Sequence, residues 1–558
     1  MSHPSTTTTA SPDVSPWRRR PAVLSSAAFL LAGLLSALLP GTAAAQVPQT
    51  VVSITFDDGN ADQLPAAQTL HAAGMKGTFY IPSGFVDAPD YLTRADLDTI
   101  AGMGHEIGGH SVTHPDLTTL PSDEAKRQIC DDRVNLTNWG FRVTSFAYPF
   151  AAATAATETL AAQCGYNSAR GLGDIQSRFG CADCPFSESM TPEDKYYLKA
   201  LDQVDNTWTL ADLQTAVTNA ETHNGGWVQI TFHHVGGSDP LAVPVQTFDD
   251  FVTWLGPRAT TNNTVVKTVD EVIGGAVQPL VNGPSVSPPG PGVNGVAQNA
   301  SLETDSTTPN VPACYMIGGY GENTPTFTTT TTAANAQEGT KAENVAVANY
   351  VSGDAKLLPT FDLGGCSPSV TAGRTYSLRA WYKSDTVTQF AVYTRSGVGT
   401  WSYWTSSPYF AASSTFTQAV WTTPAIPAGV TGLSFGLNQF NNGLLTTDSY
   451  SFYDTEGAPD PAAAVAPAQR SAVADSSTAG TAEGDGTLAD IVPAPPEASQ
   501  PVTGTGEAFA RNAPTGDAAH RARDERRGPT PDTVLLVPGP NQVEPGTPIV
   551  PVEGALTG

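Results

Sequence analysis

Residues 51–59 read VVSITFDDG, an apolar run rich in β-branched and aromatic residues that ends on two aspartates and a glycine. Such a run predicts a buried strand. Residues 64–73 then carry apolar side chains at helical spacing, and Gly74 stands where a helix would end. Residues 77–81 (GTFYI) predict the next strand. A strand, a helix and a second strand in this order are typical of a parallel α/β sheet or barrel.

The same alternation continues along the first half of the chain. Further helices are expected at 93–103, where Thr93 is a candidate N-cap, and at 123–138. Further strands are expected at 105–108, 145–148 and 227–232. We therefore predict one α/β domain over residues 46–277.

Three stretches with other compositions follow. Residues 278–297 are rich in proline and glycine and predict an extended linker. Residues 298–456 are rich in Thr, Ser, Tyr, Phe and Val without a long helical pattern, which predicts an antiparallel, all-β sandwich. Residues 457–558 contain no Trp or Tyr and are predicted to be a disordered, acidic tail.

The N-terminus has the pattern of an export signal. A basic run at Arg18–Arg20 precedes an apolar stretch at 22–39 and a small-residue cleavage site that ends at Ala45. We predict a signal peptide over residues 1–45; a retained membrane anchor is the alternative. The expected location is secreted and extracellular, with no membrane attachment after cleavage.

The six cysteines fit an oxidising compartment. The simplest pair in the second half of the chain is Cys314 with Cys366, and the Cys181-x-x-Cys184 motif is interpreted as a disulfide, not as half of a zinc site. The formal net charge of -26 argues against a nucleic-acid partner, because phosphates select basic surfaces. A monomer is expected.

Three groups of residues could carry chemistry. Asp57 and Asp58 end the first strand; such a pair is often only a turn, but the two carboxylates could take separate roles. His110 and His114 are four residues apart, which predicts that they face the same side of a helical turn and chelate one metal ion, zinc, cobalt or a similar divalent ion. His233 follows the strand at 227–232, at the end where barrels place their chemistry, whereas its neighbour His234 needs no role.

Together these groups resemble the polysaccharide deacetylase family, the NodB-homology domain. TFDDG at 55–59, HSVTHPDL at 110–117, FAYPF at 146–150 and ITFHHV at 230–235 are similar to four of its motifs, in the same order, within residues 50–275. The resemblance implies a distorted (β/α) barrel and a hydrolase.

The resemblance also implies roles for individual residues. Asp58, His110 and His114 would hold the divalent metal, Zn first; Asp57 would be the general base and His233 the general acid. Phe150 would offer a backbone N–H to the oxyanion, with Tyr148 and Pro149 beside it in the substrate groove. Many members carry arginine where Ala147 stands. What steadies Asp57 here is therefore open.

Residues 298–455 are similar to jelly-roll carbohydrate-binding modules, with 372–382 as a central strand. Their aromatic residues at 401, 403, 404 and 409 are either sugar-stacking platforms or core. The expected function is a secreted, metal-dependent deacetylase that removes N-acetyl groups from a GlcNAc-containing extracellular polysaccharide, chitin or peptidoglycan. The alternatives are an O-acetyl (xylan) esterase that uses the same site and a catalytically weak polysaccharide-binding protein.

Overall fold

The first half of the chain folds around a parallel sheet. The computed structural model describes residues 49–461 and 548–549, so the predicted signal peptide and most of the predicted tail lie outside the described residues. The strands of the sheet are β1 (Thr50–Phe56), β2 (Gly77–Ile81), β3 (Glu106–Gly109), β4 (Ser145–Ala147), β5 (Ser168–Arg170), β6 (Gly226–Phe232) and β9 (Thr264–Val266). Their order is β5-β4-β3-β2-β1-β6, with β9 paired to β1, and all pairs are parallel. The parallel α/β arrangement that the alternation predicted is confirmed, and the open sheet fits the distorted (β/α) barrel that the resemblance implied.

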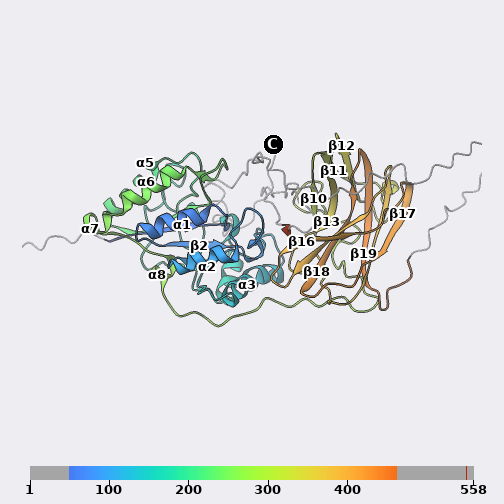
Figure 1. Ribbon diagram of the computed structural model, residues 1–558, viewed down its shortest axis with the longest axis horizontal. Helices are drawn as coiled ribbons and strands as arrows, with labels where there is room; N and C mark the ends of the chain where they lie inside the picture. Colours follow the sequence, from blue (N-terminus) through green and yellow to red (C-terminus); the bar gives the residue numbers. More distant parts are fainter. Residues whose placement is uncertain (1–48, 462–547, 550–558) are drawn as a thin grey trace, which may run out of the picture. The chain divides into compact units, whose positions relative to one another are not determined.

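Every residue of β1 is buried, as expected for a strand covered on both faces. Figure 1 shows helices α1, α2, α5 and α6 beside the sheet. The helices are α1 (Gln63–Ala72), α2 (Arg94–Gly102), α3 (Ser122–Asn138), α4 (Ala155–Gln163), α5 (Leu210–Thr222), α6 (Val245–Leu255), α7 (Arg258–Thr261) and α8 (Val269–Ile273). The predicted cap is confirmed: the Thr93 side chain accepts a hydrogen bond from the Asp96 N–H and starts α2. None of the helices in the described ranges has the length and apolar character that a membrane crossing needs.

The second half forms an antiparallel β-sandwich. Its strands are β10 (Tyr315–Tyr320), β11 (Thr324–Thr330), β12 (Ala342–Ala348), β13 (Asp354–Pro359), β14 (Tyr376–Ser384), β15 (Phe390–Ser396), β16 (Trp401–Ser406), β17 (Ser413–Thr422), β18 (Val430–Gln439) and β19 (Gly443–Asp454). One sheet runs β10-β13-β18-β15-β16 and then β20 (Pro548–Ile549), which belongs to the predicted tail; the other runs β11-β12-β19-β14-β17. The expected central strand is β14, which lies between β17 and β19.

The sandwich aromatics divide between core and surface. Trp401 is almost fully buried and stacks on Phe361 with ring centroids 4.7 Å apart, so it is core and cannot stack on a sugar. Trp404 is partly buried and packs against the sandwich core. Tyr403 is also partly buried, and its hydroxyl shares a hydrogen bond with Ser406. Tyr409 is 39% exposed, and its role in sugar binding stays a prediction.

The expected disulfide Cys314–Cys366 is present. Cys181 pairs with Cys184, as a disulfide and not a zinc half-site, and Cys130 pairs with Cys164 between α3 and the end of α4. The predicted linker has no helix or strand over residues 278–297. It is nevertheless held by α3, because the Arg133 guanidinium donates to the carbonyls of residues 278 and 279.

Candidate active site

The two aspartates that follow β1 point in different directions. Strand β1 pairs with β6 up to Phe56 and Phe232, so Asp57 and His233 leave the same edge of the sheet side by side. Asp58 then adopts a positive φ of 73°. That backbone turn separates the carboxylates: Asp58 lies beside two histidines, whereas Asp57 contacts an arginine.

Asp58, His110 and His114 converge in a buried cluster. The Asp58 Oδ1 lies 3.3 Å from His110 Nε2 and 3.2 Å from His114 Nε2, and the two Nε2 atoms are 3.0 Å apart. Among the described residues, this is the group of His, Cys, Asp or Glu side chains that could hold a metal ion. The expectation that the histidines lie on a helical turn is wrong. They lie on a loop in which Ser111 and His114 have positive φ values of 65° and 55°, and this backbone folds the two imidazoles together.

The donor set of this cluster fits a divalent metal such as zinc. His110 Nδ1 lies 2.8 Å from the carbonyl oxygen of Ala147; that oxygen can only accept, so we assign the ring hydrogen to Nδ1. The lone pair of Nε2 is thereby directed at the cluster, as in metal-ligating histidines. Burial raises the pKa of Asp58, but the adjacent imidazoles of His114 and His110 outweigh it and hold that pKa well below its usual range. The carboxylate is therefore ionised, as a ligand must be.

Asp57 is paired with Arg170, a residue that the motifs did not indicate. The Arg170 Nη2 donates to both carboxylate oxygens at 2.5 and 2.6 Å, and both side chains are almost fully buried. Burial alone would raise the pKa of Asp57; the charge of Arg170 reverses the effect and lowers it. Arg170 ends β5 directly opposite Ala147 of β4. The arginine that the third motif lacks is thus supplied by the neighbouring strand, which answers what steadies Asp57.

The two histidines after β6 differ in their surroundings. The carbonyl of His233 accepts hydrogen bonds from Gln63 Nε2 and Asn60 Nδ2 at 2.8 and 3.1 Å, which fixes the backbone where the strand ends. His234 Nδ1 instead lies 2.7 Å from the Asp62 carboxylate. His234 thus pairs with Asp62, which agrees with the expectation that His234 has no role in the chemistry.

The segment after β4 lies beside the metal cluster. Phe150 has a positive φ of 58° within a short 3₁₀ turn (Pro149–Ala151), and its ring lies 4.9 Å from that of His114. Tyr148 and Pro149 are buried, and the Tyr148 hydroxyl donates to the carbonyl of Tyr196. Phe150 is thus the one of these three residues that is partly exposed, and their roles toward substrate stay predictions.

Part of the chain is similar in sequence to known proteins. Residues 44–169 match the sequence profile of the family described as polysaccharide deacetylase. The peptidoglycan-N-acetylmuramic acid deacetylase PdaA of Bacillus subtilis (strain 168) is 33% identical over 90 residues, which are 16% of this chain and 32% of that protein. The chitooligosaccharide deacetylase of Rhizobium leguminosarum bv. trifolii is 33% identical over 81 residues, which are 14% of this chain and 35% of that protein. The chain therefore spans about a third of the length of these relatives.

Among solved structures, the family 4 carbohydrate esterase from Streptomyces lividans in complex with acetate is 15% identical, with a TM-score of 0.27, and the match covers 39% of this chain and 91% of that one. The stretch that matches the family profile contains Asp57, Asp58, His110 and His114 and ends one residue before Arg170.

Proposed function

Residues 44–169 belong to the polysaccharide deacetylase family, and from this premise we propose that the chain is a secreted, metal-dependent enzyme that hydrolyses the N-acetyl groups of a GlcNAc-containing polysaccharide, chitin or peptidoglycan. The observation that carries the proposal is that the adjacent carboxylates of Asp57 and Asp58 have different partners. Asp58 lies with two histidine Nε2 atoms, and Asp57 is held apart by Arg170. A ligand set and a free base are what amide hydrolysis at a metal centre requires.

Asp58, His110 and His114 would hold the metal, which as a Lewis acid polarises the acetyl carbonyl and makes water a better nucleophile. Asp57 takes the proton of the water that attacks the carbonyl carbon. Because the lowered pKa keeps Asp57 ionised, it is ready to act as a base at neutral pH. The two contacts from Arg170 fix the carboxylate in one orientation, so its oxygens need not reorganise during proton transfer.

His233 completes the proposed reaction as the acid. An amine is a poor leaving group unless it is protonated, so the nitrogen of the sugar must receive a proton as the C–N bond breaks. His233 leaves β6 beside Asp57, at the same edge of the sheet, which suits this role. The backbone N–H of Phe150, in the strained turn beside His114, would stabilise the negative charge on the acetyl oxygen.

The test is acetate release from chitin oligomers, peptidoglycan and acetylated xylan, with and without a chelator. We expect release from an N-acetylated substrate, loss with the chelator and recovery when Zn²⁺ or Co²⁺ is added. If acetate is released from acetylated xylan alone, the chain is instead an O-acetyl esterase. If no acetate is released from any substrate after metal is restored, the proposal that the chain is an enzyme is refuted. In Asp57→Asn we expect unchanged metal content and almost no turnover; full turnover would show that Asp57 is not the base.

A further inference from the structure

The loop that carries His110 and His114 is held from outside its own sheet by α3. Gln128 makes three hydrogen bonds to it: the Gln128 carbonyl accepts from the Val112 N–H at 3.1 Å, its Oε1 accepts from the Thr113 N–H at 3.0 Å, and its Nε2 donates to Thr113 Oγ1 at 3.0 Å. Gln128 and Thr113 are buried. Since Thr113 directly precedes His114, the position of Gln128 helps to set the position of that imidazole.

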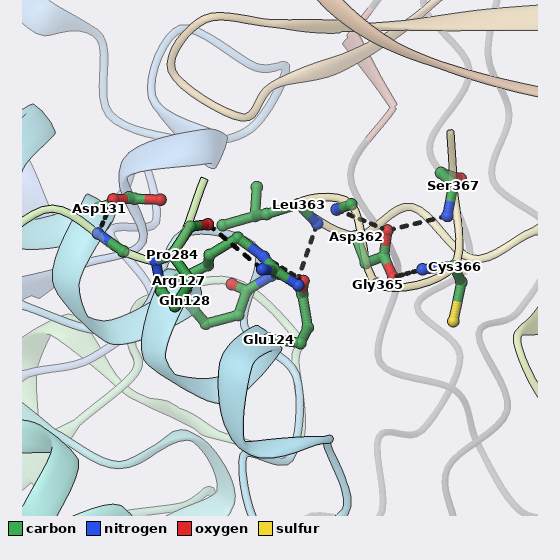
Figure 2. A network of polar contacts seen from close by, with 12 residues as sticks. Glu124, Arg127, Gln128, Asp131, Pro284, Asp362, Leu363, Gly365, Cys366 and Ser367 are labelled. Atoms are coloured by element: carbon green, nitrogen blue, oxygen red, sulfur yellow. Dashed lines mark hydrogen bonds and ion pairs between the residues drawn. The ribbon is translucent and has the colours of Figure 1, made fainter. Parts of the chain in front are cut away.

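Gln128 is in turn connected to the β-sandwich. Its Nε2 also donates to Glu124 Oε1 at 3.1 Å, and the same oxygen accepts the backbone N–H of Leu363 at 2.8 Å. Figure 2 shows this chain of contacts, with Glu124 and Gln128 on α3 and Leu363 on the sandwich segment before Cys366. Glu124 is buried, and Arg127 Nε donates to its other oxygen at 2.9 Å. Both folded halves belong to one compact unit.

A second contact joins the sandwich to the same loop without an intermediary. The turn between β15 and β16 contains Gly399, with a φ of +90°. A Cβ atom at Gly399 would lie 2.4 Å from Val112 Cγ1 and 3.0 Å from Leu363 Cδ2. The backbone of this turn therefore packs closely against the residue midway between the two histidines. The adjacent Val398 carbonyl accepts a hydrogen bond from Asn135 of α3 at 3.0 Å.

We propose that the β-sandwich is a structural component of the metal site: the turn at Gly399, together with the relay from Leu363 through Glu124 and Gln128, holds the loop 110–114 in its metal-binding conformation. This function differs from that of a tethered sugar-binding module, which would leave the metal site unchanged if it were displaced. The proposal rests on the ligand roles proposed above for His110 and His114. Glu124, Gln128 and Gly399 are positioning residues that do not touch substrate.

The chain offers a matched pair of glycines for the test. Gly399 and Gly429 both lie in the sandwich with positive φ values of +90° and +83°, so alanine causes similar backbone strain at both positions. The Cβ at Gly429 would meet nothing within 4 Å. In the full chain stripped of metal, we expect Gly399→Ala to raise the Kd for Zn²⁺ by about 10- to 100-fold, the usual effect of losing outer support of metal ligands. Gly429→Ala should bind Zn²⁺ as the parent does.

The relay gives an independent variant if Gly399→Ala fails to fold. Glu124→Ala removes the oxygen shared by Leu363 and Gln128 and should also weaken Zn²⁺ binding, whereas Glu124→Gln keeps an accepting oxygen and should restore most of the affinity. Lys126→Ala, on the same helix, is the control. If Gly399→Ala and Glu124→Ala fold and keep the parent Kd, the proposal is wrong. If the parent protein itself binds no Zn²⁺, the roles of His110 and His114 as metal ligands are wrong, and so is the proposed function.

Discussion

The proposed role of Arg170, to orient the general base Asp57, can be tested by removing the arginine and then restoring it from the neighbouring strand. In Arg170→Met, a buried Asp57 loses the guanidinium that contacts both of its oxygens. Without these contacts the Asp57 carboxylate is free to turn away from the attacking water. A misplaced catalytic group costs on the order of 100-fold in rate, so kcat should fall roughly 100-fold. The assay is the rate of acetate release with metal in excess.

The rescue variant separates orientation from general damage to the fold. Ala147 lies opposite Arg170 in the register of β4 and β5, so Ala147→Arg combined with Arg170→Ala returns a guanidinium to the same place from the neighbouring strand. We expect kcat of the double variant to rise above that of Arg170→Met toward the parent value. Arg178→Met, which removes an exposed arginine, is the control. An unchanged kcat in Arg170→Met would refute the reasoning, and so would a double variant that folds but recovers no activity.

Three further outcomes are expected. His114→Ala should lose bound metal, measured as metal per chain by mass spectrometry, whereas the His234→Ala control should keep it; equal metal in both would contradict the ligand set. Burial and the charge of Glu124 raise the pKa of Asp362 to about 7, so the stability from this group is full below the unfolded pKa near 3.9 and is lost as pH rises to about 7. Urea unfolding should therefore show a smaller loss of stability between pH 4 and pH 8 in Asp362→Asn than in the parent, and identical pH profiles would contradict this pKa. Trp401→Ala should lower the free energy of unfolding by about 3–5 kcal/mol, because it empties a core position; a variant as stable as the parent would show that Trp401 is not core.

Much of the first domain could be predicted because its signals are local. The buried run at 51–56 became β1, and the capping residue Thr93 started α2, since each depends on residues close by in sequence. The five residues of the candidate site also came from short motifs, and the parallel sheet explains their meeting: consecutive strands deliver their C-terminal ends to one edge.

What could not be predicted depends on backbone geometry and register. Spacing suggested a helical turn for His110 and His114, but Ser111 and His114 adopt positive φ, which is uncommon for such residues and carries no sequence signal. Arg170 ends a strand of only three residues, too short for a periodic pattern, and its role follows from being opposite Ala147. The preceding residues 166–169 read YNSA, which is not an apolar run, so no local pattern marks Arg170.

Glu124 shows a different reason for failure. In the sequence it is an acidic residue in the first turn of a helix, the usual place for a solvated carboxylate that favours the helix dipole. The structure buries it against the sandwich, more than two hundred residues further along the chain. A contact between residues so far apart in sequence cannot be predicted from a local pattern.

The pairing of Ala147 with Arg170 also bears on how such a site can change over generations. If the arginine moves from one strand to the other by single substitutions, the intermediate has either both arginines or neither. An intermediate with both arginines would place two bulky cations in one buried space. An intermediate without either arginine would leave the carboxylate of Asp57 buried without a counter-charge, which would lower stability by about 3–5 kcal/mol. Either intermediate is unfavourable, so a lineage that has placed its arginine on β5 tends to keep it there. Sequence patterns that require arginine in the third motif would count such lineages as inactive, although the guanidinium is present one strand away.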